Sequence, residues 1–524
     1  MAVKLTFHGA CGTVTGSCYE VRCSQGAILV DCGLFQGTKT IKSLNYGAFP
    51  FRTGMIDNVV LTHAHLDHAG LVPKLIGQGF NGKVFATAGT VDLLGYMLPD
   101  SGHIQESEVD RLNRRNRQRG LPSVEPIYTL EMAHAALKRL RPTSYNEWFT
   151  AAPGIRARFW DAGHILGSTS VELEIKDRDR DRPLSILFSG DIGTGDKDFH
   201  RAPEGPAGMD FVVMETTYGG TIRQPHTADR RRRMLTRELK AALKAGGVIL
   251  IPAFAVERTQ ELLFDLDSLF DSGAIPSVPV FVDSPLAQRA TEVFDKHLSF
   301  AGETHPFHRR NLRFVGSQDE SKKLNRLRGG AIIMAGSGMC DAGRIRHHLK
   351  AHLGRAETTV LMVGYQAPGT LGRLIVQGEE MIRIHGEEVR VSARIRTLDE
   401  YSGHADQAGL LKWLRDRGDI GQDLFLVHGE DPAREAFSEA VRSHGLPKAR
   451  IRRPVHGETV SLSATTGAKT VGVSASVDVA GTCAEDWHNA YSKTILDLRK
   501  TLHALPTDSA RKALLAKMRR SMPI

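Results

Sequence analysis

The chain has 524 residues, too many for one ordinary hydrophobic core, so we expect at least two domains. Hydrophobic residues make up 41% and charged residues 24%, a balance typical of a globular protein that excludes a largely disordered chain. The formal net charge of +9 favours a polyanionic partner, although mildly basic proteins often bind none.

The cysteines and the N-terminus predict the compartment. The six cysteines fit neither a disulfide framework nor a zinc knuckle, and four of them lie in apparent N-terminal strands. The opening "MAVKLTFHGA" predicts a first β-strand and no signal peptide. No apolar run approaches the roughly 20 residues that span a bilayer. We therefore expect a cytoplasmic protein that does not associate with a membrane.

The order of predicted elements indicates one domain interrupted by another. Residues 1–209 combine short strands and glycine turns with a helical, basic stretch. Over 210–387 apolar runs alternate with helices, as in βαβ units on a mostly parallel sheet, and over 388–460 the shorter pattern returns. Small, weakly polar residues at 461–484 predict a linker. Apolar positions at helical spacing in 485–524 predict a helical extension that could form a homodimer contact.

The segment "VVLTHAHLDHAG" predicts a metal site. His63, His65, Asp67 and His68 follow an apolar strand, and imidazoles and carboxylates are ligands that suit zinc. Residues at i and i+2 of an extended loop point the same way, so His63 and His65 can bind one ion. Asp67 and His68, displaced by a turn, can reach a second ion.

Two ions need more ligands, and other strand ends supply candidates. His164, Asp191 and His428 each follow an apolar run close to a glycine, in "DAGHILGS", "FSGDIG" and "LVHGE". A lone histidine is more often a hydrogen-bonded structural residue, but the repeated pattern favours ligands. Asp31 in "ILVDCG" shares it, and we expect this carboxylate to orient a ligating histidine.

These motifs resemble the metallo-β-lactamase fold. The long insertion, with "METTYG", "YSGHAD" and "LVHGE", is similar to the β-CASP branch of that superfamily over about residues 1–460. The branch includes ribonuclease J and the endonuclease subunit of the cleavage and polyadenylation specificity factor; this chain looks like a short bacterial member. The resemblance implies an α/β fold: an αββα sandwich interrupted by a β-CASP domain with a mostly parallel sheet. It also implies cleavage of RNA.

The resemblance further implies how the ligands divide. One zinc would take His63, His65 and His164, the other Asp67, His68 and His428, and Asp191 would bridge them, with manganese as an alternative ion. A hydroxide between the metals would then attack the phosphate, with Asp67 among the catalytic groups.

Glu215 in "METTYG" and His404 in "YSGHAD" have two interpretations each. From the residues alone, Glu215 caps a strand–helix turn and His404 bonds backbone groups at a helix start. The resemblance instead implies that His404 is the general acid for the leaving oxygen and that Glu215 keeps it protonated.

The insertion offers candidates for phosphate contacts at its strand ends. "GSGMCDAG" is expected to open a helix, so Ser337 and Gly338 could hold a phosphate, and Ser284 occupies an equivalent position. Ser402, next to His404, is a further candidate. Aromatic residues do not interleave with the basic runs, so the sequence predicts no dedicated platform for stacking bases.

The leading hypothesis is a zinc-dependent ribonuclease that acts on RNA, most simply single-stranded RNA, in processing or decay and leaves a 5′-phosphate and a 3′-hydroxyl. The alternatives are a hydrolase of a small ester, lactone or thioester, which would lack the insertion, and a non-catalytic RNA-binding scaffold, which would lose ligands. The sequence does not separate an endonuclease from a 5′-exonuclease.

Overall fold

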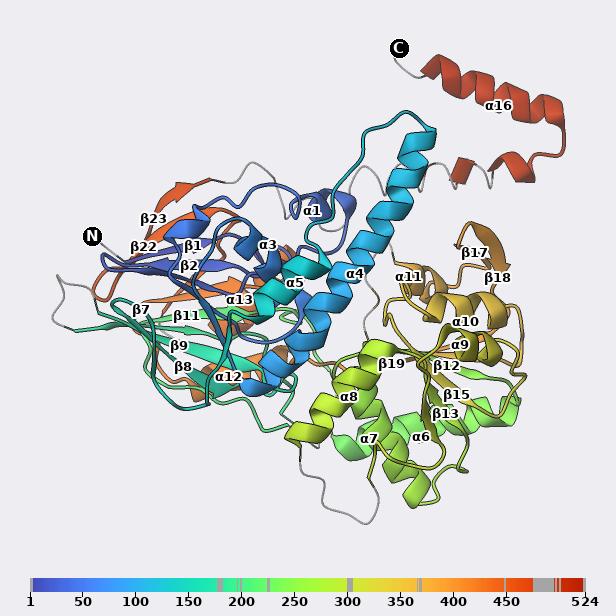
Figure 1. Cartoon of the computed structure of the whole chain (residues 1–524), viewed down its shortest axis with the longest axis horizontal. Coiled ribbons are helices and arrows are strands. Elements are labelled where there is room, and N and C mark those ends of the chain that lie inside the picture. The colour runs from blue at the N-terminus through green and yellow to red at the C-terminus, as the bar shows by residue number, and fades with distance from the viewer. Residues whose placement is uncertain are drawn as a thin grey trace.

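The computed structural model describes residues 3–176, 182–195, 197, 200–223, 227–298, 305–364, 366, 370–446, 449–474, 494, 497–498 and 501–521. Within these residues the chain forms two packed sheets with helices on their outer faces and, beside them, a second domain with its own sheet (Figure 1). This arrangement confirms the predicted αββα sandwich with an insertion.

The first sheet of the sandwich has eight strands. Their order is β23 (Gly467–Val473), β22 (Glu458–Ser463), β1 (Val3–Phe7), β2 (Tyr19–Arg22), β3 (Ala27–Val30), β4 (Asn58–Val60), β5 (Lys83–Ala86) and β6 (Leu140–Pro142). In β1 the apolar Val3, Leu5 and Phe7 are buried, and they alternate with more exposed neighbours. Because side chains alternate with a period of two residues, one face of the strand points toward the second sheet.

The second sheet has seven strands, in the order β21 (Arg450–Arg452), β20 (Asp423–Val427), β11 (Phe211–Glu215), β10 (Leu184–Phe188), β9 (Thr169–Ile175), β8 (Ile155–Asp161) and β7 (Phe149–Ala152). The two sheets share a buried core that includes Phe7, Phe159 and Phe425. β10, β11, β20 and β21 run parallel. β10, β11 and β20 are almost entirely apolar because helices cover their other face, whereas the edge strand β21 carries two arginines.

Helices complete the outer layers of the sandwich. On the side of the first sheet lie α1 (Lys39–Ser43), the 3₁₀ turn η1 (Thr53–Met55), α2 (Leu66–Ala69), α3 (Val72–Gly77), α4 (Ala88–Gln118) and α5 (Leu130–Leu137). On the side of the second sheet, α12 (Gln407–Asp416) and α13 (Asp431–Ser443) pack Trp413 and Phe437 onto the strands.

The inserted domain has a six-stranded, wholly parallel sheet. Its order is β14 (Leu312–Phe314), β13 (Val280–Val282), β15 (Ile332–Ala335), β12 (Ile249–Pro252), β16 (Thr359–Val363) and β19 (Arg394–Leu398). Its helices are α6 (Ala228–Ala245), α7 (Arg258–Asp271), α8 (Pro285–His297), α9 (Gln318–Leu324), α10 (Ile345–His352) and α11 (Leu371–Val376), and β17 (Met381–Ile384) and β18 (Glu387–Arg390) form a hairpin.

Three predicted boundaries are wrong. The insertion begins after β11 and not at 210, because β11 lies between β10 and β20 in the sandwich. It extends through β19 and does not end at 387, because β19 pairs with β16. Residues 461–473 are not a linker, since β22 and β23 extend the first sheet beside β1. The rest of the predicted linker, 475–484, lies outside the described residues.

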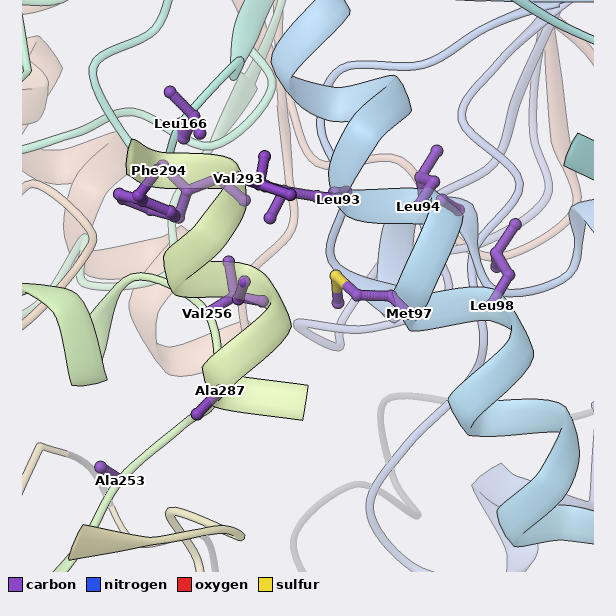
Figure 2. Close-up of a cluster of buried hydrophobic side chains, with 14 of the residues drawn as sticks. Leu93, Leu94, Met97, Leu98, Leu166, Ala253, Val256, Ala287, Val293 and Phe294 are labelled. Atoms are coloured by element: carbon purple, nitrogen blue, oxygen red, sulfur yellow. The ribbon is translucent and has the colours of Figure 1, made fainter. Parts of the chain in front are cut away.

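The two domains meet along α4 and α8. Leu93 and Met97 of α4 face Val293 of α8 across the junction, in one buried cluster that also contains Val256 and Leu166 (Figure 2). Burial of such side chains is worth roughly 1.5–3 kcal/mol each, so this contact fixes the insertion against the sandwich.

At the C-terminus, the predicted helical extension is described only in part. α16 (Asp508–Ser521) is helical, and a short helical stretch at 501–504 precedes the break at Pro506. Among the described residues, no helix combines the length and the apolar character needed to cross a bilayer.

Candidate metal centre and active site

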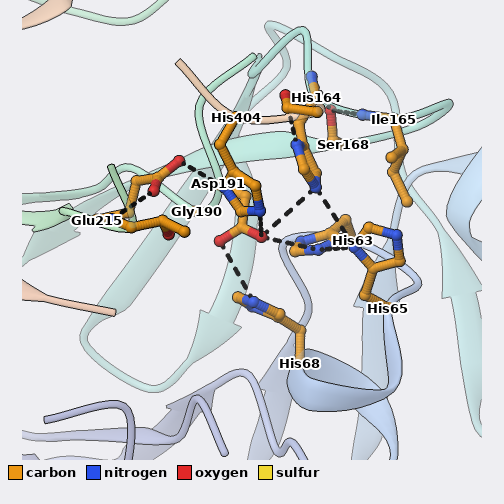
Figure 3. Close-up of polar contacts among 12 residues, drawn as sticks. His63, His65, His68, His164, Ile165, Ser168, Gly190, Asp191, Glu215 and His404 are labelled. Carbon is orange, nitrogen blue, oxygen red and sulfur yellow. Dashed lines mark hydrogen bonds and ion pairs between the residues drawn. The ribbon is translucent and has the colours of Figure 1, made fainter. Parts of the chain in front are cut away.

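The predicted ligands meet at one edge of the sandwich. His63 follows β4, whereas His164, Asp191 and His428 follow β8, β10 and β20. Because β10, β11 and β20 are parallel neighbours, their carboxyl ends bring Asp191, Glu215 and His428 together. Figure 3 shows most of these side chains converging on the carboxylate of Asp191.

A first group of ligand atoms consists of His63, His65, His164 and Asp191. His65 Nδ1 lies 3.0 Å from His63 Nε2 and 3.3 Å from His164 Nε2. Asp191 Oδ2 lies 3.5 Å from both His63 Nε2 and His164 Nε2. Three imidazoles and one carboxylate oxygen surround a single point, as a four-coordinate zinc site requires.

A second group consists of Asp67, His68 and His428. His68 Nε2 and His428 Nε2 are 3.2 Å apart, and Asp67 Oδ2 lies 3.8 Å from His428 Nε2. Asp191 Oδ1 faces this group, at 3.3 Å from His68 Nε2 and 3.7 Å from His428 Nδ1. The two oxygens of Asp191 therefore face different groups.

The outer nitrogens of the histidines have partners that fix the rings. Asp31 accepts a hydrogen bond from His68 Nδ1 at 2.8 Å, and the carbonyl of Gly403 accepts one from His164 Nδ1 at 3.0 Å. These contacts leave the Nε2 lone pairs of His68 and His164 directed inward. Asp31 also accepts bonds from the backbone and hydroxyl of Thr62. The contact with His68 is the one predicted for Asp31.

The electrostatics of the centre suit cations. Burial, followed by the repulsion of neighbouring histidines, holds the pKa of His63 and His164 well below the ordinary value, and a neutral imidazole is the form that can bind a metal ion. Asp191 Oδ1 is buried and accepts no hydrogen bond within the described part of the chain. A buried carboxylate oxygen without a donor is costly, and a metal ion is the partner that this donor set fits.

Glu215 and His404 form a pair beside the ligands. His404 Nδ1 lies 3.1 Å from Glu215 Oε1, and His404 Nε2 lies 3.8 Å from Asp191 Oδ2. Glu215 also accepts from the backbone N–H of Ile192 and of Thr217. Burial lowers the pKa of His404, but Glu215 and Asp191 outweigh burial and raise it above the ordinary value. Glu215 therefore both fixes the turns, as its structural interpretation expects, and bonds His404.

The residues predicted to contact phosphate do not gather at one point as the candidate metal ligands do. Ser284 caps α8 by accepting from the N–H of Ala287, and the buried Ser402 bonds the backbone of His404. Ser337 and Gly338 do not open a helix, because α10 begins only at Ile345. The intervening loop folds back on itself, with Ser337 N donating to Ala342 O at 3.1 Å. The expected helix N-terminus is therefore absent beside Ser337 and Gly338.

Several residues at the centre carry no strong signal in the sequence. Thr217 Oγ1 lies 3.0 Å from His428 Nδ1, and Gly403 contacts the ring of His164 so closely that a Cβ would lie 2.9 Å from it. Both are adjacent to motif residues, which is the only signal that could have indicated them. Lys197 and Glu257, which form a buried ion pair at 3.2 Å, have no such neighbour.

Comparisons with known proteins agree with this geometry. Family models match residues 11–249 (metallo-beta-lactamase superfamily), 259–375 (Beta-Casp domain) and 388–451 (Zn-dependent metallo-hydrolase RNA specificity domain). The chain is 35% identical over 461 residues to Ribonuclease TTHA0252 of Thermus thermophilus, a match that covers 86% of this chain and 99% of that protein.

Two archaeal proteins are also similar. The transcription termination factor FttA of Methanosarcina mazei is 30% identical over 88% of this chain and 72% of its own length. An RNase J-like protein of Methanocaldococcus jannaschii is 27% identical over 82% of this chain and 93% of its own length. With these relatives and an inserted domain at the metal centre, the chain belongs to the β-CASP branch of the metallo-β-lactamase superfamily and is a metal-dependent hydrolase.

Proposed function

We propose that this protein is a ribonuclease that hydrolyses RNA phosphodiesters in RNA processing or decay and leaves a 5′-phosphate and a 3′-hydroxyl. The observation that carries the proposal is the Glu215–His404 pair, held 3.8 Å from Asp191 beside two groups of metal ligands. A simple ester hydrolase of this fold needs no such pair. The printed names of the relatives and the match to an RNA specificity domain support RNA as the substrate.

The proposed cofactors are two zinc ions, with manganese as the alternative ion. His63, His65 and His164 would hold one, Asp67, His68 and His428 the other, and Asp191 would contribute one oxygen to each. Such a pair supplies a nucleophile at neutral pH, because bound water has a strongly lowered pKa, and it offsets charge on the phosphate. Asp67 is the most exposed of these carboxylates, with 21% of its side chain accessible against 2% for Asp191, which suits a group that faces substrate.

His404 is the proposed general acid. Its Nδ1 is held by Glu215, so the ring presents Nε2 to the centre, and the charge of Glu215 favours the protonated imidazole. His404 would donate this proton to the leaving oxygen, which otherwise departs as an unstable alkoxide. Its side chain is 20% exposed, whereas His63 is fully buried, so the acid stands on the substrate side of the ligands.

The proposed partner is single-stranded RNA, and the proposed compartment is the cytoplasm. Most of the candidate ligands are buried, which favours a single strand over a duplex as the substrate. Ser284, Ser337 and Gly338 are proposed to contact its phosphates. Within the described residues five cysteines are buried and free, which supports a reducing, cytoplasmic setting. The C-terminal extension is the proposed site of a homodimer contact.

The test is cleavage of 5′-labelled RNA by the zinc-loaded protein, with linear and circular forms compared in parallel. We expect fragments with 5′-phosphates and loss of activity with a chelator. A cut circle would establish internal cleavage, whereas cleavage of the linear form alone would indicate an exonuclease. Turnover of a generic ester or lactone without cleavage of RNA would contradict the proposal, as would binding of RNA without any cleavage.

Replacing the acid should separate chemistry from metal binding. We expect His404→Ala to retain its metal content and to slow RNA cleavage by roughly 10²–10⁴-fold, the usual contribution of a general acid. Single-turnover rates and metal analysis of the same preparation measure both effects. Loss of metal in this variant would show that His404 is a ligand.

A further inference from the structure

Phe254 is a large apolar side chain that remains exposed in an otherwise buried loop. It follows β12, and 39% of its surface is accessible, whereas Ala253, Val256 and Glu257 in the same loop are 2–5% exposed. Burial of a phenylalanine is worth roughly 1.5–3 kcal/mol, so a ligand that covered this ring would gain part of that free energy.

The backbone of the neighbouring strand supports the ring. A Cβ at Gly338, which follows β15, would lie only 2.7 Å from Cδ2 and Cε2 of Phe254. Because glycine has no side chain, the ring can rest against the Ser337–Gly338 turn. β12 and β15 are parallel, so Phe254 and the proposed phosphate contacts share one edge of the inserted sheet.

The loop that carries Phe254 is fixed to the metal centre. Val256 belongs to the same buried cluster as Leu166 of the sandwich (Figure 2). Glu257 bonds Lys197 at 3.2 Å, and Lys197 in turn donates to the backbone carbonyl of the ligand His164 at 3.2 Å. Three residues of extended chain span at most about 10 Å, so the ring lies within a few nucleotides of the ligands.

The other side of the loop is held within the inserted domain. Arg258, which follows Glu257, begins α7, and its Nε lies 3.9 Å from Glu261. Arg258 also donates to the carbonyl of Val363 at the end of β16. One side of the Phe254 ring meets Gly338, and 39% of the residue remains accessible, which leaves room for one planar group such as a nucleobase of the proposed substrate.

We propose that Phe254 stacks on one base of the RNA strand whose phosphate is bound at the metal centre. This inference rests on the proposed ribonuclease function and adds a position at which a base, and not only the backbone, is held. Every base has a π-face, so the contact tolerates any sequence at that position. It supplies a single stacking contact where the sequence predicted no dedicated platform.

The experiment scans an RNA oligonucleotide with one abasic ribose at successive positions around the cut. With the zinc-loaded wild-type protein we expect one position at which the abasic substitution lowers kcat/KM by roughly 5- to 150-fold, the usual worth of one stacked base. Phe254→Leu keeps an apolar side chain against Gly338 but removes the π-face. This variant should cleave intact RNA as slowly as wild type cleaves the abasic RNA. The abasic substitution should not lower the kcat/KM of the variant any further.

Two controls separate stacking from folding. Phe254→Trp should restore the wild-type profile, and Met55→Ala, at an exposed apolar residue before β4 and therefore at the opposite end of the sheet from His63, should not change it. Thermal unfolding of all variants identifies a loss of structure. An abasic profile in Phe254→Leu identical to that of wild type would overturn the inference.

A second readout keeps the inference distinct from the proposed function. RNA with 2-aminopurine at the sensitive position, or at each position in turn if no RNA is cleaved, is mixed with protein in a stopped-flow instrument before cleavage occurs. Quenching by wild type that Phe254→Leu lacks supports stacking even if cleavage fails. Cleavage without quenching that depends on Phe254 overturns the stacking contact alone. If neither cleavage nor quenching is seen, both the stacking contact and the ribonuclease function are overturned.

Discussion

At the scale of the residue, Asp191 determines what the centre can bind. Its Oδ2 lies 3.5 Å from two histidines, His63 and His164, and its Oδ1 faces two more, His68 and His428, so one carboxylate faces both candidate ligand groups. Removing it would leave His63 and His68 without the negative charge between them, and the remaining imidazoles would hold divalent cations poorly.

We therefore expect Asp191→Ala to lose metal from both groups together with all hydrolytic activity. Metal analysis after gel filtration measures the first effect and the RNA assay the second. Asp416→Ala is the matched control, because Asp416 is an exposed carboxylate bonded only to Lys412 among the interactions seen in the described chain. Retention of two metal ions by Asp191→Ala would contradict the bridging role.

At the scale of the element, the C-terminal strands decide where the sandwich ends. β22 pairs antiparallel with β1 and buries Val460 and Leu462, and β23 pairs with β22. Without them β1 becomes an edge strand, and the core loses side chains whose removal costs about 2–5 kcal/mol each.

A chain that ends after residue 457 lacks both strands and should therefore unfold at a markedly lower temperature than the full chain, or fail to remain in solution. A chain that ends after residue 474 retains both strands and should unfold at the full-length temperature. Thermal unfolding followed by circular dichroism checks both, and equal stability of the two truncated forms would show that β22 and β23 add nothing.

At the scale of the molecule, an ionic cluster joins the inserted domain to the sandwich behind the metal centre. Glu257 of the insertion accepts from Lys197 and from His200 of the sandwich at 3.2 and 2.6 Å. Burial favours the neutral carboxyl, but His200 and Lys197 outweigh it and lower the pKa of Glu257 from 4.5 to about 2. Glu257 is therefore ionised at neutral pH, and its carboxylate is buried between the two domains.

Glu257→Gln should destabilise the protein at pH 7 by about 3 kcal/mol, since it leaves the buried ammonium of Lys197 without its nearest counter-charge. Because the folded-state pKa is lowered, the stabilisation is complete above about pH 4.5 and is lost as the pH falls toward about 2. The difference between the free energies of unfolding of Glu257→Gln and wild type, measured with urea, should become smaller as the pH falls through that range. Glu108→Gln, at an exposed glutamate of α4, should show no difference at any pH.

The sequence by itself determined the fold class and indicated the candidate metal ligands. The ligands occur in a short motif and at strand ends with a repeated pattern, and a parallel sheet necessarily collects such ends at one edge. The alternation of βαβ units likewise indicated the insertion. These features depend on local order along the chain, which the sequence records directly.

Only the tertiary structure decided the boundaries, the supports of the ligands and the contacts between domains. β11 and β19 resemble the strands beside them in the sequence, so pairing alone assigns each to its sheet. Lys197 and Glu257 are 60 residues apart, and Phe254 differs from other phenylalanines only in being exposed. Such properties arise when distant segments pack, because burial and charge pairing depend on which surfaces the fold brings together.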